Sequence, residues 1–224
     1  MRVLLIGATG LVGGMVAERL LGRGHDVHAL VRRPAGRGWH EHVAPAAEWP
    51  SIVAEIGGAD AAISCLGTTW RQAGSQEAFR AVDHDAVVAF ARAARVAGVD
   101  RFLSVSSVGA DARSRNFYLR IKGETDDALK EIGFPRLDIM RPGLLLGIRG
   151  GDRRPGERIA IMLDPLSRLF LRGSLARYAG ISAATVAAAI VGAAEASEPG
   201  MRVHEHRDIA RLANQLLTSG PAPR

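Results

Sequence analysis

Cysteine is almost absent from this chain: Cys65 is the only one in 224 residues. A single thiol cannot form an internal disulfide and offers no cluster of cysteine ligands, so we predict no metal site. The apolar run from Met1 to Ile6 lacks the charged and small-residue zones of a secretory signal. These two absences predict a protein of a reducing compartment, the cytoplasm.

Long apolar runs are also absent. No stretch approaches the roughly 18 consecutive apolar residues of a membrane span, so we expect no membrane association. Hydrophobic residues still make up 47% of the chain, enough for a sizeable core. We predict one domain over residues 1–217. The tail, residues 218–224, is rich in proline, and we expect it to be disordered.

Lysine is scarce, because Lys122 and Lys130 are the only two among 29 basic residues. The formal net charge of +6 could suggest a nucleic-acid partner. The arginines are scattered, however, and form no basic stripe interleaved with aromatic residues, so we expect no nucleic-acid binding. In a chain this biased toward arginine, a lysine near a chemically active group is notable.

Apolar runs of strand length alternate with segments of helical periodicity, as in a parallel sheet covered by helices on both faces. The expected strands are Val3–Ile6, Val27–Val31, Asp60–Leu66, Phe102–Val105, Leu137–Met140 and Met201–His204. The expected helices are Leu11–Leu21, Ser75–Ala97, Phe117–Ile132 and one that Ser182 caps and that ends near Ala196. The apolar stripe of the second helix is Phe79, Val82, Ala86, Phe90, Ala93 and Ala97. The pattern predicts an α/β protein with a Rossmann-type doubly wound parallel sheet.

A glycine-rich turn, GATGLVG, lies between the first expected strand and the first expected helix. In a dinucleotide-binding turn, Gly7 would permit the tight bend, Gly10 would let the backbone approach a pyrophosphate, and Gly13 would let the helix pack closely. The free amides of the helix N-terminus attract phosphate. The alternative is an ordinary strand-to-helix turn. We expect cofactor contacts from Gly7, Thr9, Gly10, Leu11, Val12 and Gly13.

Two arginines, Arg32 and Arg33, follow the second expected strand. NAD-dependent proteins usually place an acidic residue there to hold the ribose 2′-hydroxyl, whereas arginine accommodates a 2′-phosphate. The guanidinium group can donate to two phosphate oxygens together. A solvated pair of charges before Pro34 is the alternative. The residues favour NADP(H) over NAD(H).

Tyr118 and Lys122 lie four residues apart in an expected helix and so share one face. A tyrosine hydroxyl is a poor acid near neutral pH unless a nearby cation favours its phenolate, and Lys122 could be that cation. Ser106 or Ser107, at the end of the preceding strand, could donate a hydrogen bond to a substrate carbonyl. Together these groups would make a reductase site. The alternative is that Tyr118 packs on the sheet while Lys122 extends to the surface.

The segments GATGLVGG, VRRP, SSVGAD, YLRIK and RPGLLLG resemble the atypical short-chain dehydrogenase/reductases, which include the NAD(P)H-binding, NmrA-like proteins. The longer segments CLGTTWRQAGS, FYLRIKGE and RPGLLLGIRGGDRRPGE are similar to the Tat-interacting oxidoreductase group and its small bacterial relatives. The resemblance covers most of the chain. It implies a Rossmann fold, an NADP(H) cofactor and catalytic roles for Ser106, Tyr118 and Lys122.

The resemblance also implies further cofactor contacts, from Leu66, Gly67, Thr68, Lys122, Pro142 and Gly143. Two departures from the family pattern stand out. Many members have a catalytic asparagine in the Ser75–Ala97 segment, where this chain has none and where Asp83 or His84 could substitute. The acidic residue that often contacts adenine is missing around His42–Pro45.

Substrate recognition is expected in residues 143–180, a small C-terminal substrate or lid region. The part from Ile159 to Phe170 is strongly apolar and could be a flap over an apolar small molecule, a packed helix or a partner surface. His204 and His206 are interpreted as surface residues. The residues favour an NADP(H)-dependent reductase of a small-molecule carbonyl. A dinucleotide-binding redox sensor and a nucleotide-sugar epimerase-like enzyme are the alternatives, and a homodimer or other protein partner is left open.

Overall fold

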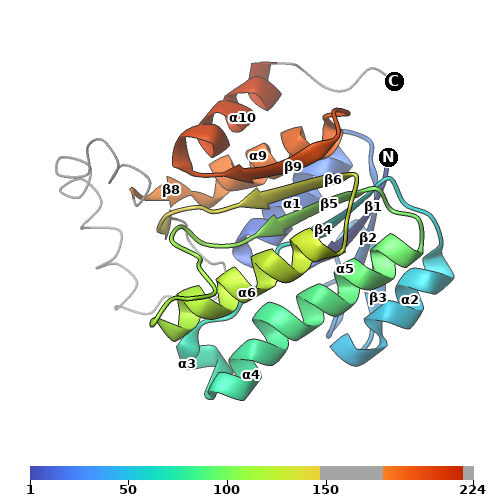
Figure 1. Cartoon of the computed structure of the whole chain (residues 1–224). Coiled ribbons are helices and arrows are strands. Elements are labelled where there is room, and N and C mark those ends of the chain that lie inside the picture. Colours follow the sequence, from blue (N-terminus) through green and yellow to red (C-terminus); the bar gives the residue numbers. More distant parts are fainter. Residues whose placement is uncertain (147–178, 219–224) are drawn as a thin grey trace.

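A computed structural model describes residues 1–146 and 179–218, and these residues form a sheet with helices on both sides (Figure 1). The strand order is β3-β2-β1-β4-β5-β6-β9, and each neighbouring pair is parallel. The strands are β1 (Arg2–Ile6), β2 (Asp26–Val31), β3 (His40–Val43), β4 (Ala61–Ser64), β5 (Arg101–Val105), β6 (Arg136–Met140) and β9 (Gly200–His204). This order confirms the predicted Rossmann-type sheet. A short parallel pair, β7 (Leu145–Leu146) with β8 (Ile181–Ser182), lies outside it.

The central strands are buried on both faces because successive side chains point to opposite sides. In β1, Val3 and Leu5 join one core cluster, whereas Leu4 and Ile6 join the other. The first cluster lies under α1 (Leu11–Gly22), α9 (Ala183–Glu195) and α10 (His206–Thr218). The second lies under α2 (Trp49–Ile56), α5 (Ala86–Val96) and α6 (Phe117–Glu131). The sheet is therefore doubly wound, as Figure 1 shows.

Helix α9 is buried on nearly all sides, which explains its run of alanines and valines. The Ser182 side chain accepts a hydrogen bond from the Thr185 amide at 3.0 Å, so the predicted cap is confirmed. Gly192 lets α10 lie close, because a Cβ there would be 3.3 Å from the Leu212 carbonyl oxygen. Helix α10 was not predicted, although Ile209, Ala213 and Leu216 recur at helical spacing and are buried.

The segment predicted as one helix, Ser75–Ala97, is α4 (Gln76–Arg80), a π turn (Ala81–Asp85) and α5. Phe79 and Phe90 are buried as predicted. Ala86, Ala93 and Ala97 of the predicted stripe are partly buried and pack against the second core cluster. The fully buried positions lie beside the stripe, at Asp83, Val87, Ala91 and Ala94. The wide π turn accompanies this change of face. The carboxylate of Asp83 therefore points inward, where the apolar pattern predicted Val82.

Several predicted features fall outside the described residues. Most of the predicted substrate or lid region lies in residues 147–178. Thr218, predicted as the start of the tail, is the last residue of α10, and the rest of the tail lies beyond the described part of the chain. Over the part of the chain that the structure does describe, no helix combines the length and apolar character needed to cross a membrane.

Gly13 is a point of tight packing that a stability measurement can test. We expect Gly13→Ala to lower the free energy of unfolding by about 1–3 kcal/mol, the usual cost of overpacking. The added Cβ would lie 2.2 Å from the carbonyl oxygen of Gly7. Gly22→Ala in the same helix is the matched control, since its Cβ would meet nothing within 4 Å. Urea unfolding followed by circular dichroism measures both variants, and equal stabilities would contradict this packing.

Candidate active site

The carboxyl ends of β1 and β4 lie side by side at the centre of the sheet, where the strand order reverses. In open α/β sheets this reversal leaves a crevice in which ligands bind. Gly7 follows β1, and the segment Cys65 to Thr68 follows β4. Both sequence motifs that were expected to contact a dinucleotide therefore meet at the position where the fold offers a site.

The glycine turn has the geometry that the sequence predicts. Gly7 has a φ of +82°, and a Cβ there would lie 2.5 Å from the carbonyl carbon of Cys65. Gly10 is the N-cap of α1, and within residues 1–146 and 179–218 no side chain caps the first turn. Thr9 and Gly10 are exposed, Leu11 is half-buried, and Val12 is buried. Among the described residues, the N-terminus of α1 is thus left without a side-chain cap, and a helix N-terminus of this kind favours an anion.

Arg32 and Arg33 are exposed at the end of β2, and neither has an ion-pair partner among residues 1–146 and 179–218. The loop after them has a fixed shape because the Glu41 carboxylate accepts hydrogen bonds from the Ala35 amide at 3.0 Å and the Arg37 amide at 3.4 Å. Arg37, which the sequence analysis missed, lies beside the start of α1, with Nη1 3.5 Å from the position of a Cβ on Gly14. Arginine side chains therefore surround the second strand's end.

Tyr118 and Lys122 lie in α6, which begins where Asn116 caps the helix by accepting a hydrogen bond from the Leu119 amide. Tyr118 is 39% exposed, while Lys122 is only 6% exposed. Lys122 is paired with Asp83 of the π turn, with 2.7 Å between Nζ and Oδ1. The alternative in which Lys122 extends to the surface is therefore excluded. Asp83 stands in the segment where the family's asparagine was missing.

The π turn is anchored so that Asp83 faces the site. The other carboxylate oxygen of Asp83 accepts a hydrogen bond from the Thr68 amide at 2.8 Å, which fixes the loop after β4. The Thr125 hydroxyl of α6 lies 2.9 Å from the Asp83 carbonyl oxygen and donates to it. Gly67 borders the pair, because a Cβ there would lie 3.6 Å from Asp83 Oδ1 and 3.7 Å from Lys122 Nζ. π turns are frequent at functional sites.

The charge of Lys122 is maintained despite its burial. Burial by itself lowers the pKa of a lysine, but the carboxylate of Asp83 and smaller contributions from Tyr118 and Asp126 outweigh it, and the pKa of Lys122 is raised above its usual 10.5. Lys122 is therefore a permanent cation near neutral pH. It lies one helical turn from Tyr118, on the same face of α6.

Ser106 is buried and points into a second polar group. Its hydroxyl donates to Asp126 Oδ2 at 3.0 Å, and the same oxygen accepts from Arg141 Nε at 2.9 Å. Burial raises the pKa of Asp126, although Arg141, Ser106 and Lys122 oppose this effect. Ser107 is half-buried, with its hydroxyl 3.4 Å from the Val108 carbonyl oxygen. The choice between Ser106 and Ser107 as a substrate contact stays a prediction.

The loop after β5 is tied to both α6 and β6. Gly123 of α6 lets this loop lie against the helix, because a Cβ there would be 2.2 Å from the Ala112 amide nitrogen. The buried Pro142 carbonyl accepts from the Val108 amide at 3.0 Å. Gly143 follows, half-buried. The serines, Tyr118 and the turn after β6 are thus held at one end of the sheet.

Aromatic side chains gather beside Tyr118. Phe79 contacts both Phe117 and Tyr118 edge to face, with ring centroids 5.7 and 5.8 Å apart. Trp70 of α3 (Trp70–Ala73) contacts Phe117 in the same way and is 55% exposed. Figure 1 shows α3 next to the start of α6. An exposed aromatic surface therefore borders the predicted catalytic tyrosine.

Some site features were missed by the sequence analysis. Asp126 and Arg141 were not considered, although Tyr118, Lys122 and Asp126 lie at intervals of four residues along one face of α6. The interpretation of His204 as a surface residue is wrong, because it is 6% exposed and its Nε2 lies 2.7 Å from Asp138 Oδ1. Asp138 in turn accepts from Arg136 at 2.7 Å. His204 is thus a partner in a buried polar group of β6 and β9.

The comparison with protein families decides the membership of the chain. A family model described as NAD(P)H-binding matches residues 7–197. The chain belongs to the NAD(P)H-binding family. The match begins at Gly7, the first residue of the glycine turn, and this membership confirms the predicted resemblance to the atypical short-chain dehydrogenase/reductases.

Curated relatives of this NAD(P)H-binding protein match from about two thirds to nearly all of its length. Protein FMP52-1, mitochondrial, of Scheffersomyces stipitis is 32% identical over 96% of this chain and 100% of its own. Protein HTATIP2 of Rattus norvegicus is 34% identical over 70% of this chain and 68% of its own. The prediction of a cytoplasmic location is wrong, because the FMP52 relatives are named mitochondrial. A low cysteine count indicates a reducing environment without specifying the compartment.

Solved structures share the fold at low sequence identity. UDP-glucose 4-epimerase of Thermotoga maritima has a TM-score of 0.69 at 12% identity, covering 100% of this chain and 84% of that one. The human epimerase family protein SDR39U1, solved with NADPH, has a TM-score of 0.62 at 22% identity, covering 92% and 74%. These likenesses show that the Rossmann architecture is shared.

Proposed function

We propose that this chain is an NADP(H)-dependent reductase of a small-molecule carbonyl, with Tyr118 as the proton donor. The observation that carries the proposal is the buried Lys122–Asp83 pair, held one helical turn from Tyr118 at the carboxyl end of the sheet. Lysine is rarely buried unless it is paired, and a buried, charge-perturbed lysine close to a tyrosine is a candidate for a functional site.

The residues at the glycine turn fit a dinucleotide. A Cβ at Gly7 or Gly13 would clash with backbone atoms, so both positions require glycine and leave the backbone accessible. Among the described residues, the first turn of α1 also has no side-chain cap on its amides. Gly7, Thr9, Gly10, Leu11, Val12 and Gly13 would hold the pyrophosphate, and Arg32 and Arg33 would hold a 2′-phosphate. Leu66, Gly67, Thr68, Pro142 and Gly143 would lie along the nicotinamide half. When bound, the cofactor supplies the hydride.

The protein's own groups would handle the proton. The Tyr118 hydroxyl donates its proton to the carbonyl oxygen of the substrate as negative charge develops there, and the Lys122 cation stabilises the resulting phenolate. Asp83 keeps that cation charged and fixed, so it is a positioning residue. Ser106 donates to Asp126 in this structure. A direct Ser106 bond to substrate therefore requires its hydroxyl to turn away from Asp126.

The aromatic surface beside Tyr118 favours an apolar, flat substrate. Trp70 is 55% exposed where its ring meets Phe117, and Tyr118 is 39% exposed beside them. Planar rings stack well against such surfaces. An aromatic ketone, aldehyde or quinone is the substrate class that these contacts favour.

Calorimetric titration with NADPH and NADH, followed by an absorbance screen of aromatic carbonyls for NADPH loss, tests this function. Tight NADPH binding with turnover supports the reductase. Tight binding without turnover across the panel favours the redox-sensor alternative instead, and binding of neither nucleotide would refute both. Burial raises the pKa of the Cys65 thiol to about 12, which favours the protonated, unreactive form of the cysteine.

A double variant tests the proposed preference for NADPH. We expect Arg32→Asp combined with Arg33→Ala to weaken NADPH binding by about 10- to 100-fold, the loss of one or two charge-assisted hydrogen bonds, and to change NADH binding much less. Arg113→Ala, in the loop after β5, is the matched control. Equal weakening of both nucleotides in the double variant would contradict the proposed 2′-phosphate contacts.

A further inference from the structure

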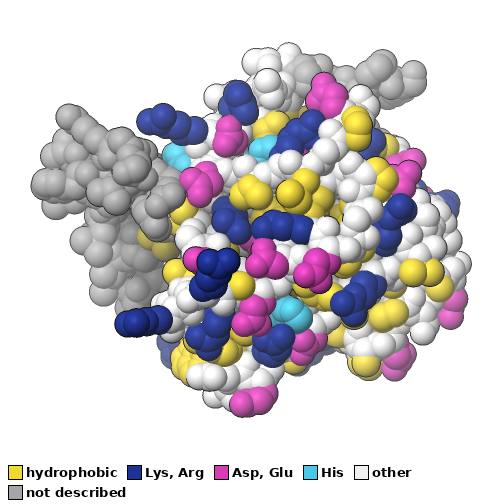
Figure 2. Space-filling view, in the orientation of Figure 1, with side chains coloured by type: hydrophobic (Ala, Val, Ile, Leu, Met, Phe, Trp, Pro, Cys, Tyr) yellow, Lys and Arg dark blue, Asp and Glu magenta, His cyan; other side chains and the backbone are white. Residues whose placement is uncertain are grey.

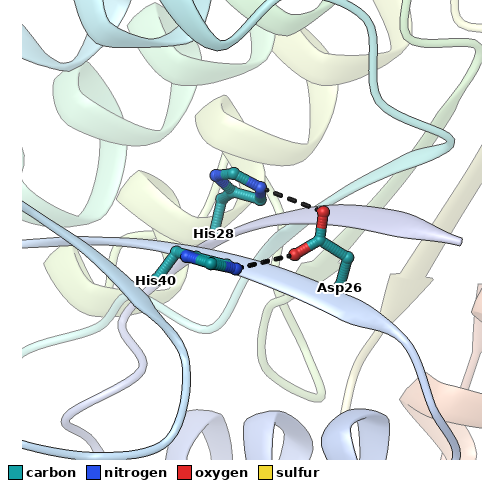
Figure 3. Close-up of side chains that lie close together, drawn as sticks. All are labelled: Asp26, His28 and His40. Carbon is teal, nitrogen blue, oxygen red and sulfur yellow. Dashed lines mark hydrogen bonds and ion pairs between the residues drawn. The ribbon is translucent and has the colours of Figure 1, made fainter.

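Three potential metal ligands meet at the edge of the sheet, and none of them belongs to the proposed reductase site. Asp26 and His28 belong to β2, and His40 belongs to β3 (Figure 3). The ligand atoms of the three side chains all lie within 4.8 Å of one another. His28 Nε2 is 3.2 Å from Asp26 Oδ2, and His40 Nε2 is 3.2 Å from Asp26 Oδ1.

The strand register brings these residues together. His28 and His40 are direct partners in the parallel pairing of β2 with β3, and Asp26 lies two residues before His28 on the same face of its strand. Asp26 is the first residue of β2 and His40 the first of β3. The cluster therefore lies toward the amino ends of these strands, whereas Arg32, Arg33 and the glycine turn follow carboxyl ends.

The hydrogen bonds around His28 allow its Nε2 lone pair to face a metal ion. His42 Nε2 lies 3.0 Å from His28 Nδ1. When His28 donates its Nδ1 proton to His42, its Nε2 carries a lone pair that faces the Asp26 carboxylate, itself an acceptor. The His28 ring also stacks on those of His40 and His42, with centroids 4.9 and 5.3 Å apart. Protonating all three rings would place like charges in contact, whereas a metal ion bound to the Nε2 lone pair of His28 favours the tautomer in which His28 Nδ1 donates to His42.

The geometry points to a Zn²⁺ site formed by His28 Nε2, His40 Nε2 and one carboxylate oxygen of Asp26. Imidazole and carboxylate are ordinary zinc ligands, and a tetrahedral ion would draw their atoms to roughly 3.3 Å apart, with water as the fourth ligand. The side chains can close this distance because His40 is 68% exposed and Asp26 is 40% exposed. His42 orients His28, and Arg2, whose Nε is 3.2 Å from Asp26 Oδ2, orients the carboxylate.

The bound ion would join the edge strand β3 to β2. Between His40 and His42, Glu41 holds the loop that follows Arg32 and Arg33 through the amides of Ala35 and Arg37. Zn²⁺ binding should therefore raise the melting temperature of the protein, since an ion that binds only the folded state stabilises it by mass action. This readout does not depend on the proposed reductase activity.

The test is calorimetric titration of chelator-treated, tag-free full-length protein with Zn²⁺, compared with His40→Ala and Asp26→Asn. We expect one ion per chain and a loss of affinity of about tenfold or more in each variant. His84→Ala is the matched control, because His84 forms a His–carboxylate pair with Asp85 at 2.8 Å but belongs to no described three-ligand cluster. Its affinity for Zn²⁺ should be unchanged.

Cobalt provides a second, spectroscopic measurement. Co²⁺ in a site of low coordination number gives strong visible absorption bands, which we expect in the wild-type protein and not in His40→Ala. His40 is exposed enough that its removal should leave the fold intact, and circular dichroism checks this. Equal Zn²⁺ affinity in wild type, His40→Ala and Asp26→Asn would overturn the proposal, as would a loss of affinity in His84→Ala as large as in His40→Ala.

Discussion

Tyr118→Phe should reduce kcat/KM for carbonyl reduction by about 10²- to 10⁴-fold, the usual contribution of a positioned general acid. The variant removes only the phenolic hydroxyl, so the edge-to-face contact with Phe79 is retained. NADPH affinity and melting temperature should therefore stay at their wild-type values. Steady-state absorbance kinetics, calorimetric titration and thermal unfolding measure the three quantities.

Two outcomes would contradict the role of Tyr118 as the acid. A Tyr118→Phe protein with full activity would show that the proton comes from another group. An equal loss of NADPH affinity would show instead that the hydroxyl binds the cofactor. Lys122→Met should also lose activity, because the phenolate would lack its cation, but its loss of a buried charge makes it the less specific variant.

Asp83→Asn should lower the free energy of unfolding by about 3–5 kcal/mol near neutral pH, because it leaves the buried Lys122 cation without its carboxylate. The amide oxygen of asparagine can still accept the hydrogen bond that the Thr68 amide donates to Asp83, so the loop after β4 should keep its shape. Asp85→Asn, two residues along, is the matched control. Asp85 is 58% exposed, and removing its charge should cost no more than about 1 kcal/mol.

The pH dependence of the Asp83→Asn effect has a defined sign. In the wild type the pKa of Lys122 is raised, so its stabilising contribution is complete below the usual value of 10.5 and is lost only as pH rises through the folded-state pKa. Without Asp83, burial lowers this pKa, and stability should increase with pH as it approaches 10.5. The difference in the free energy of unfolding between wild type and Asp83→Asn should therefore become smaller from neutral to alkaline pH, as measured by urea unfolding. A free-energy difference that does not change with pH would contradict the ion pair between Lys122 and Asp83.

The distribution of surface charge says less about function than the buried Lys122–Asp83 pair does. On the face shown in Figure 2, basic and acidic side chains are interspersed, so the net charge of +6 is not gathered into one patch there. This is consistent with the scattered arginines of the sequence. The absence of a nucleic-acid partner stays a prediction.

The strands and helices that the sequence predicted could be read from it because their determinants are local, whereas β3, α2 and α10 were not predicted. The apolar run from Val3 to Ile6 in β1, which is buried on both faces of the sheet, identifies a parallel strand without any tertiary information. Glycines at positions 7 and 13 indicated a tight strand-to-helix turn, since only glycine tolerates the positive φ of the first and the close carbonyl at the second. The four-residue spacing of Tyr118 and Lys122 likewise placed both on one face of α6.

Only the tertiary structure decided which partners these residues meet. The inward turn of Asp83 depends on a π turn, and one additional residue per turn moves the buried face to positions that the regular α-helical period does not mark. The Asp26, His28 and His40 cluster depends on the parallel register of β2 with β3, which no spacing within either strand reveals. Strand and helix positions follow from local pattern, whereas the chemistry of a buried site follows from contacts between segments far apart in the chain.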